Sequence, residues 1–284
     1  MHYFWMINCG PPSPLSSNKS SIKSFPHSGK RLGALQLLIG SNPLCNTFIN
    51  LIISLHYNYE EVTATECVNT NSSQWPTNYV PSVSACLGVS FPQEPLCHAG
   101  VTFQQWYRVL MSVAMYIHYQ KLFKGTAPLT NRTRLALSFL ENVVFIGGTS
   151  VTSTESIEWH EVFCGLYFVF HTFTMALTIV MTKYKLNHLE QSNNVLHVKD
   201  RNIRQRQQHT EKAYSLRIRL FQFWCFCLCF MVFFFATAKG SMCTVNGWYS
   251  MFAIFEWLTL WTGFSFDCLE YLDLYDVSLM LVED

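Results

Sequence analysis

The sequence predicts an all-helical integral membrane protein, a six-helix transmembrane bundle with both termini in the cytoplasm. Half of the 284 residues are hydrophobic, 15% are aromatic and only 13% are charged, whereas soluble domains carry about 25% charged residues. The formal net charge is +1, and no nucleic-acid-binding motif is present, so nothing indicates DNA or RNA as a partner. The expected solvent of most of the chain is therefore the phospholipid bilayer.

Six segments are apolar over most of the roughly 17–25 residues that a membrane-spanning helix needs. In chain order they are about 33–57, 100–119, 135–151, 161–182, 220–238 and 247–268. Residues 41–43, Ser-Asn-Pro, interrupt the first segment, and the third is short and contains Glu141. The fifth, FQFWCFCLCFMVFFFATA, has no charged residue and gives the strongest prediction of a span.

The basic residues predict the orientation, because Lys and Arg collect in cytoplasmic loops. Four precede the first span, four lie between the second and third, and nine lie from Lys183 to Arg219, which leaves only Arg108 and Lys239 of the 19 elsewhere. This distribution places all three basic segments on one side only if there are six spans. It predicts a disordered N-terminal tail over 1–32, a membrane domain over 33–275 with a luminal loop 58–99 and a basic cytoplasmic loop 183–219, and a short C-terminal tail over 276–284.

A luminal loop permits glycosylation, because that compartment contains the glycan-transfer machinery. Asn71 begins an N-x-S/T sequon inside loop 58–99 and is the predicted glycosylation site. The sequons at Asn18 and Asn131 fall on the cytoplasmic side and are expected to remain unmodified.

The 11 Cys residues do not predict a metal site. Cys225, Cys227 and Cys229 alternate inside an apolar run, and alternate positions on a helix face different sides. In such a run Cys behaves as a small hydrophobic residue. We therefore expect no metal ligands in the chain.

Four ionisable residues lie well inside the predicted spans, away from their ends: Arg108, Glu141, His171 and Glu256. Such groups are costly in a bilayer and normally face a partner or a polar cavity. With a rise of about 1.5 Å per residue, Arg108 and Glu256 lie at similar depths and could pair, while Glu141 and His171 both lie near the middle. One interpretation is that all four are structural ion pairs between helices.

The second interpretation is a polar chamber that opens to the lumen and contains these four residues. The small residues 147–150, Gly-Gly-Thr-Ser, and His160 at the luminal mouth of the fourth span would also line it. Small residues let helices approach closely or leave room for a ligand. The chamber would explain why Glu141 is tolerated in an otherwise apolar helix.

Five stretches occur together in a fixed order: PLCNTFINLIISLHYNYEEVTATEC, NYVPSVSACLG, YRVLMSVAMYIHY, ENVVFIGGTSVTSTESIEWHE and CTVNGWYSMFAIFEWLTLWTGFSF. In combination they resemble the post-GPI attachment to proteins factor 2 family, within the wider group that includes the damage-regulated autophagy modulators. The resemblance covers residues 43 to about 275. It therefore includes nearly all of the chain except the N-terminal tail.

The resemblance implies a multi-pass protein of the Golgi apparatus or endoplasmic reticulum membrane that remodels the lipid of GPI anchors. The expected reaction is reacylation of a lyso-GPI intermediate at sn-2 with a saturated fatty acyl chain, which would make the chain an acyltransferase. Expected partners are a GPI-anchored lipid or protein, the bilayer and other remodelling enzymes. No cofactor is implied, and the acyl donor, a phospholipid or cytoplasmic acyl-CoA, is left open.

The resemblance also suggests roles for residues that match the family pattern. His160 is the expected general base, oriented by Glu141 or Glu256 from a neighbouring span, because the adjacent Glu161 diverges from it by about 100 degrees on a helix. Arg108 is expected to bind a GPI phosphate, since a guanidinium matches phosphate oxygens in pairs. The remaining candidates for substrate binding are Asn142, His118 and His171.

The same pattern contains Cys67 and Cys243, which flank the luminal ends of the first and sixth spans. We therefore predict a disulfide between them, with Cys86–Cys97 as a second candidate bridge.

Two positions depart from the family. Asp267 stands where the family has a His, and the fourth-span His is displaced by about three residues, close to one helical turn, to His171.

A non-enzymatic alternative also fits the sequence: a membrane regulator or lipid-binding partner like the autophagy modulators. No nucleophile motif such as G-x-S-x-G is present, and such a motif would have favoured an enzyme.

Overall fold

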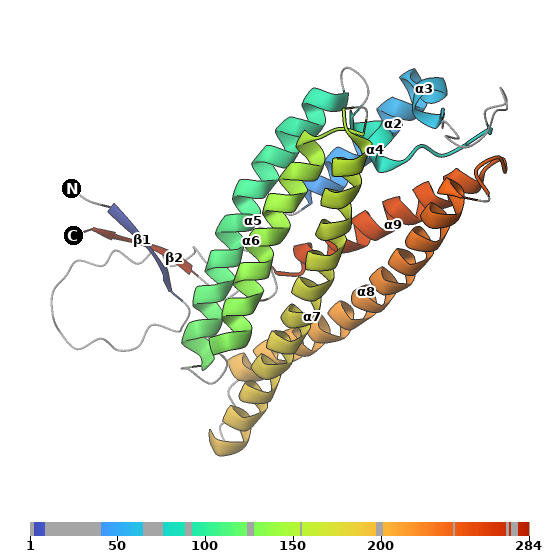
Figure 1. Cartoon of the computed structure of the whole chain (residues 1–284). Coiled ribbons are helices and arrows are strands. Elements are labelled where there is room, and N and C mark those ends of the chain that lie inside the picture. The colour runs from blue at the N-terminus through green and yellow to red at the C-terminus, as the bar shows by residue number, and fades with distance from the viewer. Residues whose placement is uncertain are drawn as a thin grey trace.

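The computed structural model describes residues 3–8, 41–64, 76–88, 93–123, 128–153, 155–196, 201–240, 242–270, 273 and 278–283. Its elements are β1 (Tyr3–Asn8), α2 (Asn42–Tyr57), α3 (Tyr59–Thr63), α4 (Val83–Gly88), α5 (Gln93–Phe123), α6 (Pro128–Ser150), α7 (Ile157–Leu196), α8 (Arg201–Lys239), α9 (Trp248–Cys268) and β2 (Ser278–Glu283). The helical prediction is confirmed (Figure 1). Outside the helices, β1 and β2 pair as an antiparallel ribbon in which Tyr3 lies opposite Glu283.

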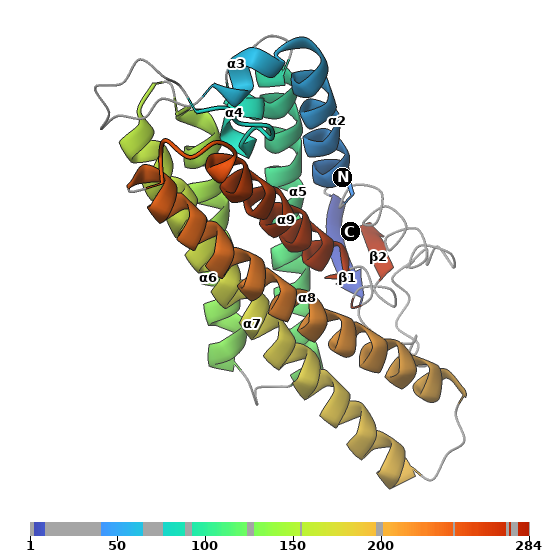
Figure 2. The same ribbon diagram turned by 90° about the vertical axis from the view of Figure 1, so that its right-hand side faces the viewer.

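The long helices form a closed ring around the interior of the bundle. Each packs against the next in the order α2, α5, α6, α7, α8, α9, and α9 returns to α2 (Figures 1 and 2). A hydrogen bond from Trp261 Nε1 to Thr47 Oγ1, 3.1 Å long, joins α9 to α2 and closes the ring. The short helices α3 and α4 cover the end of the ring at which α5 begins and α6 ends.

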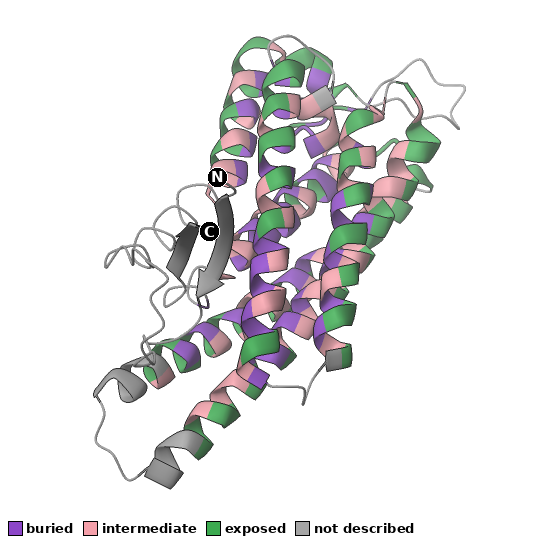
Figure 3. Ribbon diagram, turned by 90° about the vertical axis from the view of Figure 1, so that its left-hand side faces the viewer, coloured by how far each residue is buried: buried purple, intermediate pink, exposed green. Residues whose placement is uncertain are grey.

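Figure 3 shows which positions of the helices are exposed and which are buried. Many of the exposed side chains are large and apolar, and many of the buried ones are polar. Trp106 on α5, Val143 on α6 and Phe173 on α7 are all more than half exposed, whereas Glu141 and His171 are completely buried. Water would oppose this arrangement, but hydrocarbon favours it, since only apolar side chains are stable against lipid. The molecule is therefore a membrane protein.

Two helical segments, Ile157–Gln191 and Gln207–Lys239, are long and apolar enough to cross a membrane by length and composition alone. Only 22% and 17% of their most apolar windows are buried in the protein. A core helix of a soluble protein would be mostly buried, so these values favour contact with lipid.

The first span was expected from about residue 33, and its residues 33–40 lie outside the described residues. The described helix α2 begins at Asn42 with Pro43 in its first turn, where proline's missing N–H costs nothing. One boundary differs from that expected. The basic segment 183–219 was expected to be a loop, but α7 and α8 continue through most of it. Its Lys, Arg, Glu and Gln residues are good helix formers, so the two helices extend beyond the apolar segments.

The segment before α4 is fixed to the loop between α8 and α9. Gly247 N–H donates to the Thr77 carbonyl at 2.8 Å, and Tyr79 N–H donates to Ser250 Oγ at 2.7 Å. Gly247 has φ of 74°, a left-handed conformation that glycine adopts without strain. These bonds hold the predicted luminal loop over this end of the ring.

The cysteines of this region agree with the prediction in part. Cys243 is disulfide-bonded, while its predicted partner Cys67 lies outside the described residues, as does Asn71. Cys86 and Cys97 are free thiols, so the second candidate bridge is wrong. The sequon residue Asn131 is 3% exposed, and its amide donates to the Tyr116 carbonyl.

A group of ion pairs joins the helices at the opposite end of the ring. Asp273 accepts from Arg217 Nη1 at 2.7 Å and from Lys185 Nζ at 3.3 Å, and Arg134 pairs with Glu270 at 2.6 Å. Burial alone raises the pKa of the Asp273 carboxyl, but Arg217 and Lys185 outweigh that effect, so this pKa lies below its usual range. The basic residues of the predicted cytoplasmic side thus tie α6, α7 and α8 to the segment after α9.

Candidate functional site

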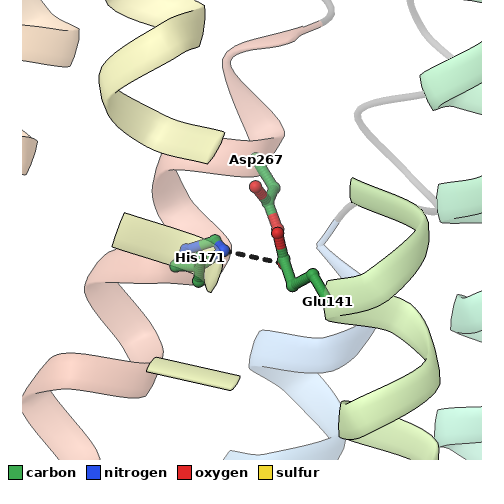
Figure 4. A group of neighbouring side chains, drawn as sticks. All are labelled: Glu141, His171 and Asp267. Carbon is green, nitrogen blue, oxygen red and sulfur yellow. Dashed lines mark hydrogen bonds and ion pairs between the residues drawn. The ribbon is translucent and has the colours of Figure 1, made fainter. Parts of the chain in front are cut away.

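Glu141 lies between three helices in the middle of the bundle. Its Oε1 accepts from Arg108 Nη2 on α5 and from His171 Nδ1 on α7, the latter at 2.8 Å. Arg108 Nη2 also lies 3.0 Å from Asp267 Oδ2 at the end of α9. Figure 4 shows Glu141 pointing toward both His171 and Asp267. The four residues form one network, which we call the central ion cluster.

Glu141 and His171, which were both expected near the middle of their spans, are in contact in the central ion cluster. The predicted pairing of Arg108 with Glu256 is wrong, because the Arg108 guanidinium contacts Glu141 and Asp267 instead. Equal depth fixes how far along a helix a residue lies but leaves open which way it faces. Asp267, which the sequence showed only as a departure from the family, completes the cluster.

Aromatic side chains enclose the histidine of this cluster. The His171 ring stacks on Tyr167 with centroids 5.5 Å apart and meets the edge of Trp224 at 4.7 Å. On α9, a Cβ at Gly263 would lie 2.8 Å from both His171 Nε2 and Trp224 Cζ3. Only glycine leaves room there for the buried ring of His171.

The replacement Gly263→Ala is therefore expected to destabilise the protein. The added methyl must displace two buried rings, and overpacking of this kind costs about 1–3 kcal/mol. Thermal unfolding of the purified protein measures the effect. The matched control is Gly165→Ala on α7, where a new Cβ meets nothing within 4 Å; equal melting temperatures for the two variants would contradict the packing argument.

Three members of the central ion cluster also have the composition of a metal site. One ligand atom each from Glu141, His171 and Asp267 lies within 4.8 Å of the others. However, Arg108 Nη2 already contacts both carboxylates, and a guanidinium keeps its charge in proteins. A divalent ion would be repelled by that fixed cation, so the geometry favours an ion-pair network between helices.

A mainly apolar cavity lies between the central ion cluster and the covered end of the ring, and we call it the upper cavity. It has about 880 Å³ of space between its lining atoms, which includes the part open to the surroundings. Val101, Val144, Phe163 and Leu260 contribute apolar walls from four helices. Its polar lining includes His160, Cys164, Glu256 and the small residues Gly148 and Thr149. Pockets of this composition bind ligands with a large apolar part.

His160 is fixed at the rim of this cavity by the backbone. Its Nδ1 lies 2.8 Å from the carbonyl oxygen of Val151, directly after α6, and its Nε2 lies 3.5 Å from Cys164 Sγ. A carbonyl only accepts, so Nδ1 carries the proton and Nε2 of the neutral ring is an acceptor. The expected orientation of His160 by Glu141 or Glu256 is therefore wrong, because Val151 supplies the orienting contact.

The other acidic residues near His160 have separate roles. Glu161 pairs with Lys239 at the end of α8, in agreement with its predicted divergence from His160. Glu256 lines the upper cavity, and its Oε2 accepts from Val83 N–H at 2.8 Å at the first residue of α4. Of the predicted catalytic residues, the cavity thus brings together His160 and Glu256, while Glu141 lies in the central ion cluster.

A second cavity, the lower cavity, continues toward the basic end of the ring. Arg108, Asp267 and Glu270 line it. The two cavities share Pro43, Gln104 and Phe264 in their linings. Apolar space beside His160 therefore adjoins polar space beside the central ion cluster. The prediction of one polar chamber shared by the four span residues is wrong, because Glu141 and His171 line neither cavity, Glu256 lines the upper one and Arg108 lines the lower one.

The remaining predicted binding residues lie apart from these cavities. Asn142 is buried, and its Nδ2 donates to the Ser138 carbonyl in the same helix. His118 is buried one and a half turns before the end of α5, about 15 Å along the helix from Arg108 at 1.5 Å per residue. Neither is in the lining of the upper or lower cavity.

Cys164 is the residue of this site that the sequence analysis missed. It lies four residues after His160 on α7, so both side chains share one face of the helix. The spacing was visible in WHEVFC, but an isolated Cys in an apolar span is indistinguishable from a small hydrophobic residue.

Comparisons with known proteins agree with this architecture. Residues 33–277 match the family model described as Frag1/DRAM/Sfk1/Cwh43P N-terminal domain. The chain is 24% identical to Post-GPI attachment to proteins factor 2 of Drosophila melanogaster over 265 residues, which cover 93% of this chain and 92% of that protein. It is 25% identical to Acyltransferase PGAP2 of Xenopus tropicalis over 244 residues, 85% of this chain and 86% of that protein.

No solved structure is similar to this chain. The match to the family model includes every helix from α2 to α9, and the relatives confirm the resemblance to post-GPI attachment to proteins factor 2. The chain belongs to the Frag1/DRAM/Sfk1/Cwh43P N-terminal domain family.

Proposed function

We propose that this protein remodels the lipid of GPI anchors in Golgi or endoplasmic reticulum membranes, and that it reacylates a lyso-GPI intermediate at sn-2 with a saturated fatty acyl chain. The observation that carries the proposal is the upper cavity, a mainly apolar space whose lining includes His160. An acyl chain needs such space, and its transfer needs a base beside it. The names of the two relatives support the substrate and the reaction.

The proposal includes six spans with both termini in the cytoplasm. Helices α2 and α5–α9 overlap the six predicted spans in chain order. The pairing of β1 with β2 is compatible with an even number of spans. His160 then lies at the luminal end, where a GPI anchor presents its glycan. Arg134, Lys185 and Arg217 lie at the cytoplasmic end, as the charge rule expects.

Arg108 has a structural role in this proposal. Its Nη2 holds two carboxylates, and a phosphate would have to compete with both. We therefore withdraw the expectation that Arg108 binds the GPI phosphate and assign it to the central ion cluster.

The test uses the purified full chain in phosphatidylcholine nanodiscs with lysophosphatidylinositol as acceptor. A labelled stearoyl chain is offered in one arm on phosphatidylcholine and in the other on CoA, and the label at sn-2 of the product is measured after phospholipase A2 release. We expect transfer from one donor. Binding of the lipid without transfer from either donor would support the regulator instead of the enzyme.

A cavity-filling variant tests whether the upper cavity is where the chain binds. Leu260→Trp fills space in its lining, and we expect transfer to fall by at least about tenfold, the effect of a loss of 1.4 kcal/mol in binding. Val232→Trp is the control, because Val232 is 55% exposed on the outside of α8. Equal transfer rates for the two variants would place the acyl chain elsewhere.

A further inference from the structure

The nitrogen of His160 that is able to accept a proton faces a thiol. The bond from Nδ1 to the Val151 carbonyl leaves Nε2 as the acceptor of the neutral ring, and the group at Nε2 is Cys164 Sγ at 3.5 Å. A thiol next to a histidine acceptor is the arrangement that activates cysteine nucleophiles. Both side chains line the upper cavity, so an acyl carbonyl held there would lie beside the sulfur.

One feature of the surroundings would stabilise the imidazolium that proton transfer from sulfur forms on His160. Val151 follows directly on the 23-residue helix α6, and the carboxyl end of a helix carries a partial negative charge that stabilises a nearby cation. The imidazolium formed at His160 would be held against that end through Nδ1. The same contact fixes the ring, so Nε2 stays directed at Cys164.

Space is left open beside the sulfur. Gly148 on α6 lies across the helix interface from Cys164, and a Cβ built on it would lie 3.6 Å from Cys164 Sγ and 3.4 Å from Phe163 Cβ. These distances are ordinary van der Waals contacts, so a methyl at position 148 would fit. A branched side chain at this position would extend over the thiol. Glycine at this position therefore keeps access to the sulfur free.

We infer that Cys164 is the acyl-accepting nucleophile of this protein, with His160 as its base, and that transfer proceeds through a thioester on Cys164. This inference rests on the proposed acyl transfer and specifies its route. It requires a fatty acyl ester or thioester as donor. The alternative, direct attack by the acceptor hydroxyl on the donor, uses His160 but not Cys164.

The two steps balance without an oxidant or reductant. In the first, Sγ attacks the donor carbonyl, the S–H proton passes to His160 Nε2, and the donor's alcohol or thiol leaves with that proton. In the second, the acceptor hydroxyl gives its proton to Nε2 and attacks the thioester carbonyl. The C–S bond then breaks, and Cys164 regains a proton from His160.

The experiment incubates the purified full chain with an alkyne-tagged stearoyl chain, carried by phosphatidylcholine or by CoA, without an acceptor. We expect tag on the peptide that contains Cys164, released by neutral hydroxylamine and discharged when lysophosphatidylinositol is added. Cys229, exposed on α8, is the internal control. Equal tagging of Cys229 would show non-specific acylation and overturn the inference.

Variants separate this inference from the proposed function. Cys164→Ala is expected to lower transfer to lysophosphatidylinositol by at least about 100-fold, the lower range for removal of a catalytic group, while Cys229→Ala leaves it unchanged. Gly148→Val keeps the thiol and the imidazole and is expected to slow thioester formation at normal protein level. This variant tests the inference even if Cys164→Ala fails to fold.

The outcomes are distinguishable. Transfer by Cys164→Ala at the wild-type rate would overturn the inference and leave the proposed function standing. A thioester on Cys164 that is not discharged by the lysolipid would support the nucleophile and overturn the proposed acceptor. Absence of both thioester and transfer in the wild type would overturn both.

Discussion

The replacement Arg108→Met is expected to remove most of the folded protein. Arg108 is the one fixed cation of the central ion cluster and contacts both Glu141 and Asp267. Without it, the carboxylates of Glu141 and Asp267 would lose the guanidinium that both contact. Breaking a buried ion pair by removing one partner costs about 3–5 kcal/mol, a large part of the 5–15 kcal/mol that stabilises a typical protein.

Protein abundance and thermal unfolding in detergent measure this effect. The control is Lys239→Met, which breaks the pair with Glu161 at the rim, where the side chains are 45% and 33% exposed; exposed pairs contribute about 0–1 kcal/mol. The double variant Arg108→Met with Glu141→Gln removes one charge of each sign and is expected to recover part of the loss. Wild-type abundance of Arg108→Met alone would contradict a structural role.

Helix positions could be predicted from the sequence because they depend on local composition. The span 220–238 lies within α8, and the span 247–268 agrees with α9 to within one residue, since apolar length and the cost of exposing backbone in lipid determine them. The extension of α7 and α8 through the basic segment was not predicted. Hydropathy marks the end of an apolar stretch, which is not the end of a helix.

The site could be predicted in part, and the limit was the direction in which each side chain points. Depth along a helix brought Glu141 and His171 together correctly. It failed for Glu256, whose oxygen accepts from Val83 N–H, because α4 is a short helix with no hydropathy signal. Depth also failed to predict the role of Asp267. This residue lies at the end of its span, so it was not counted among the charges inside the membrane.

The orientation of His160 could not be predicted either, because the sequence does not show which way a side chain points. The contact that fixes its ring is a backbone carbonyl nine residues earlier, Val151. Any residue type supplies a carbonyl, so no pattern in the sequence marks it. Only the close approach of α6 and α7 at Gly147 and Gly148 brings it to His160, and a Cβ at Gly147 would lie 2.8 Å from the Phe163 ring.

The replacement His160→Asn is expected to abolish acyl transfer while the protein stays folded. The Asn amide can occupy the place of Nδ1 and still donate to the Val151 carbonyl, but it has no group at the place of Nε2. Removal of a positioned acid or base lowers a rate by about 10²–10⁴-fold. The loss is expected in kcat, because the apolar walls that bind the acyl chain are unchanged.

The assay is transfer to lysophosphatidylinositol by purified protein, with retention of GPI-anchored proteins at the cell surface and protein abundance as cellular readouts. His188→Asn is the matched control, an exposed histidine on the same helix, and it is expected to behave as wild type. A purely structural histidine would give a different result, in which abundance and melting temperature fall together with transfer. More than a tenth of wild-type transfer in a stable His160→Asn variant would show that Nε2 takes no proton during the reaction.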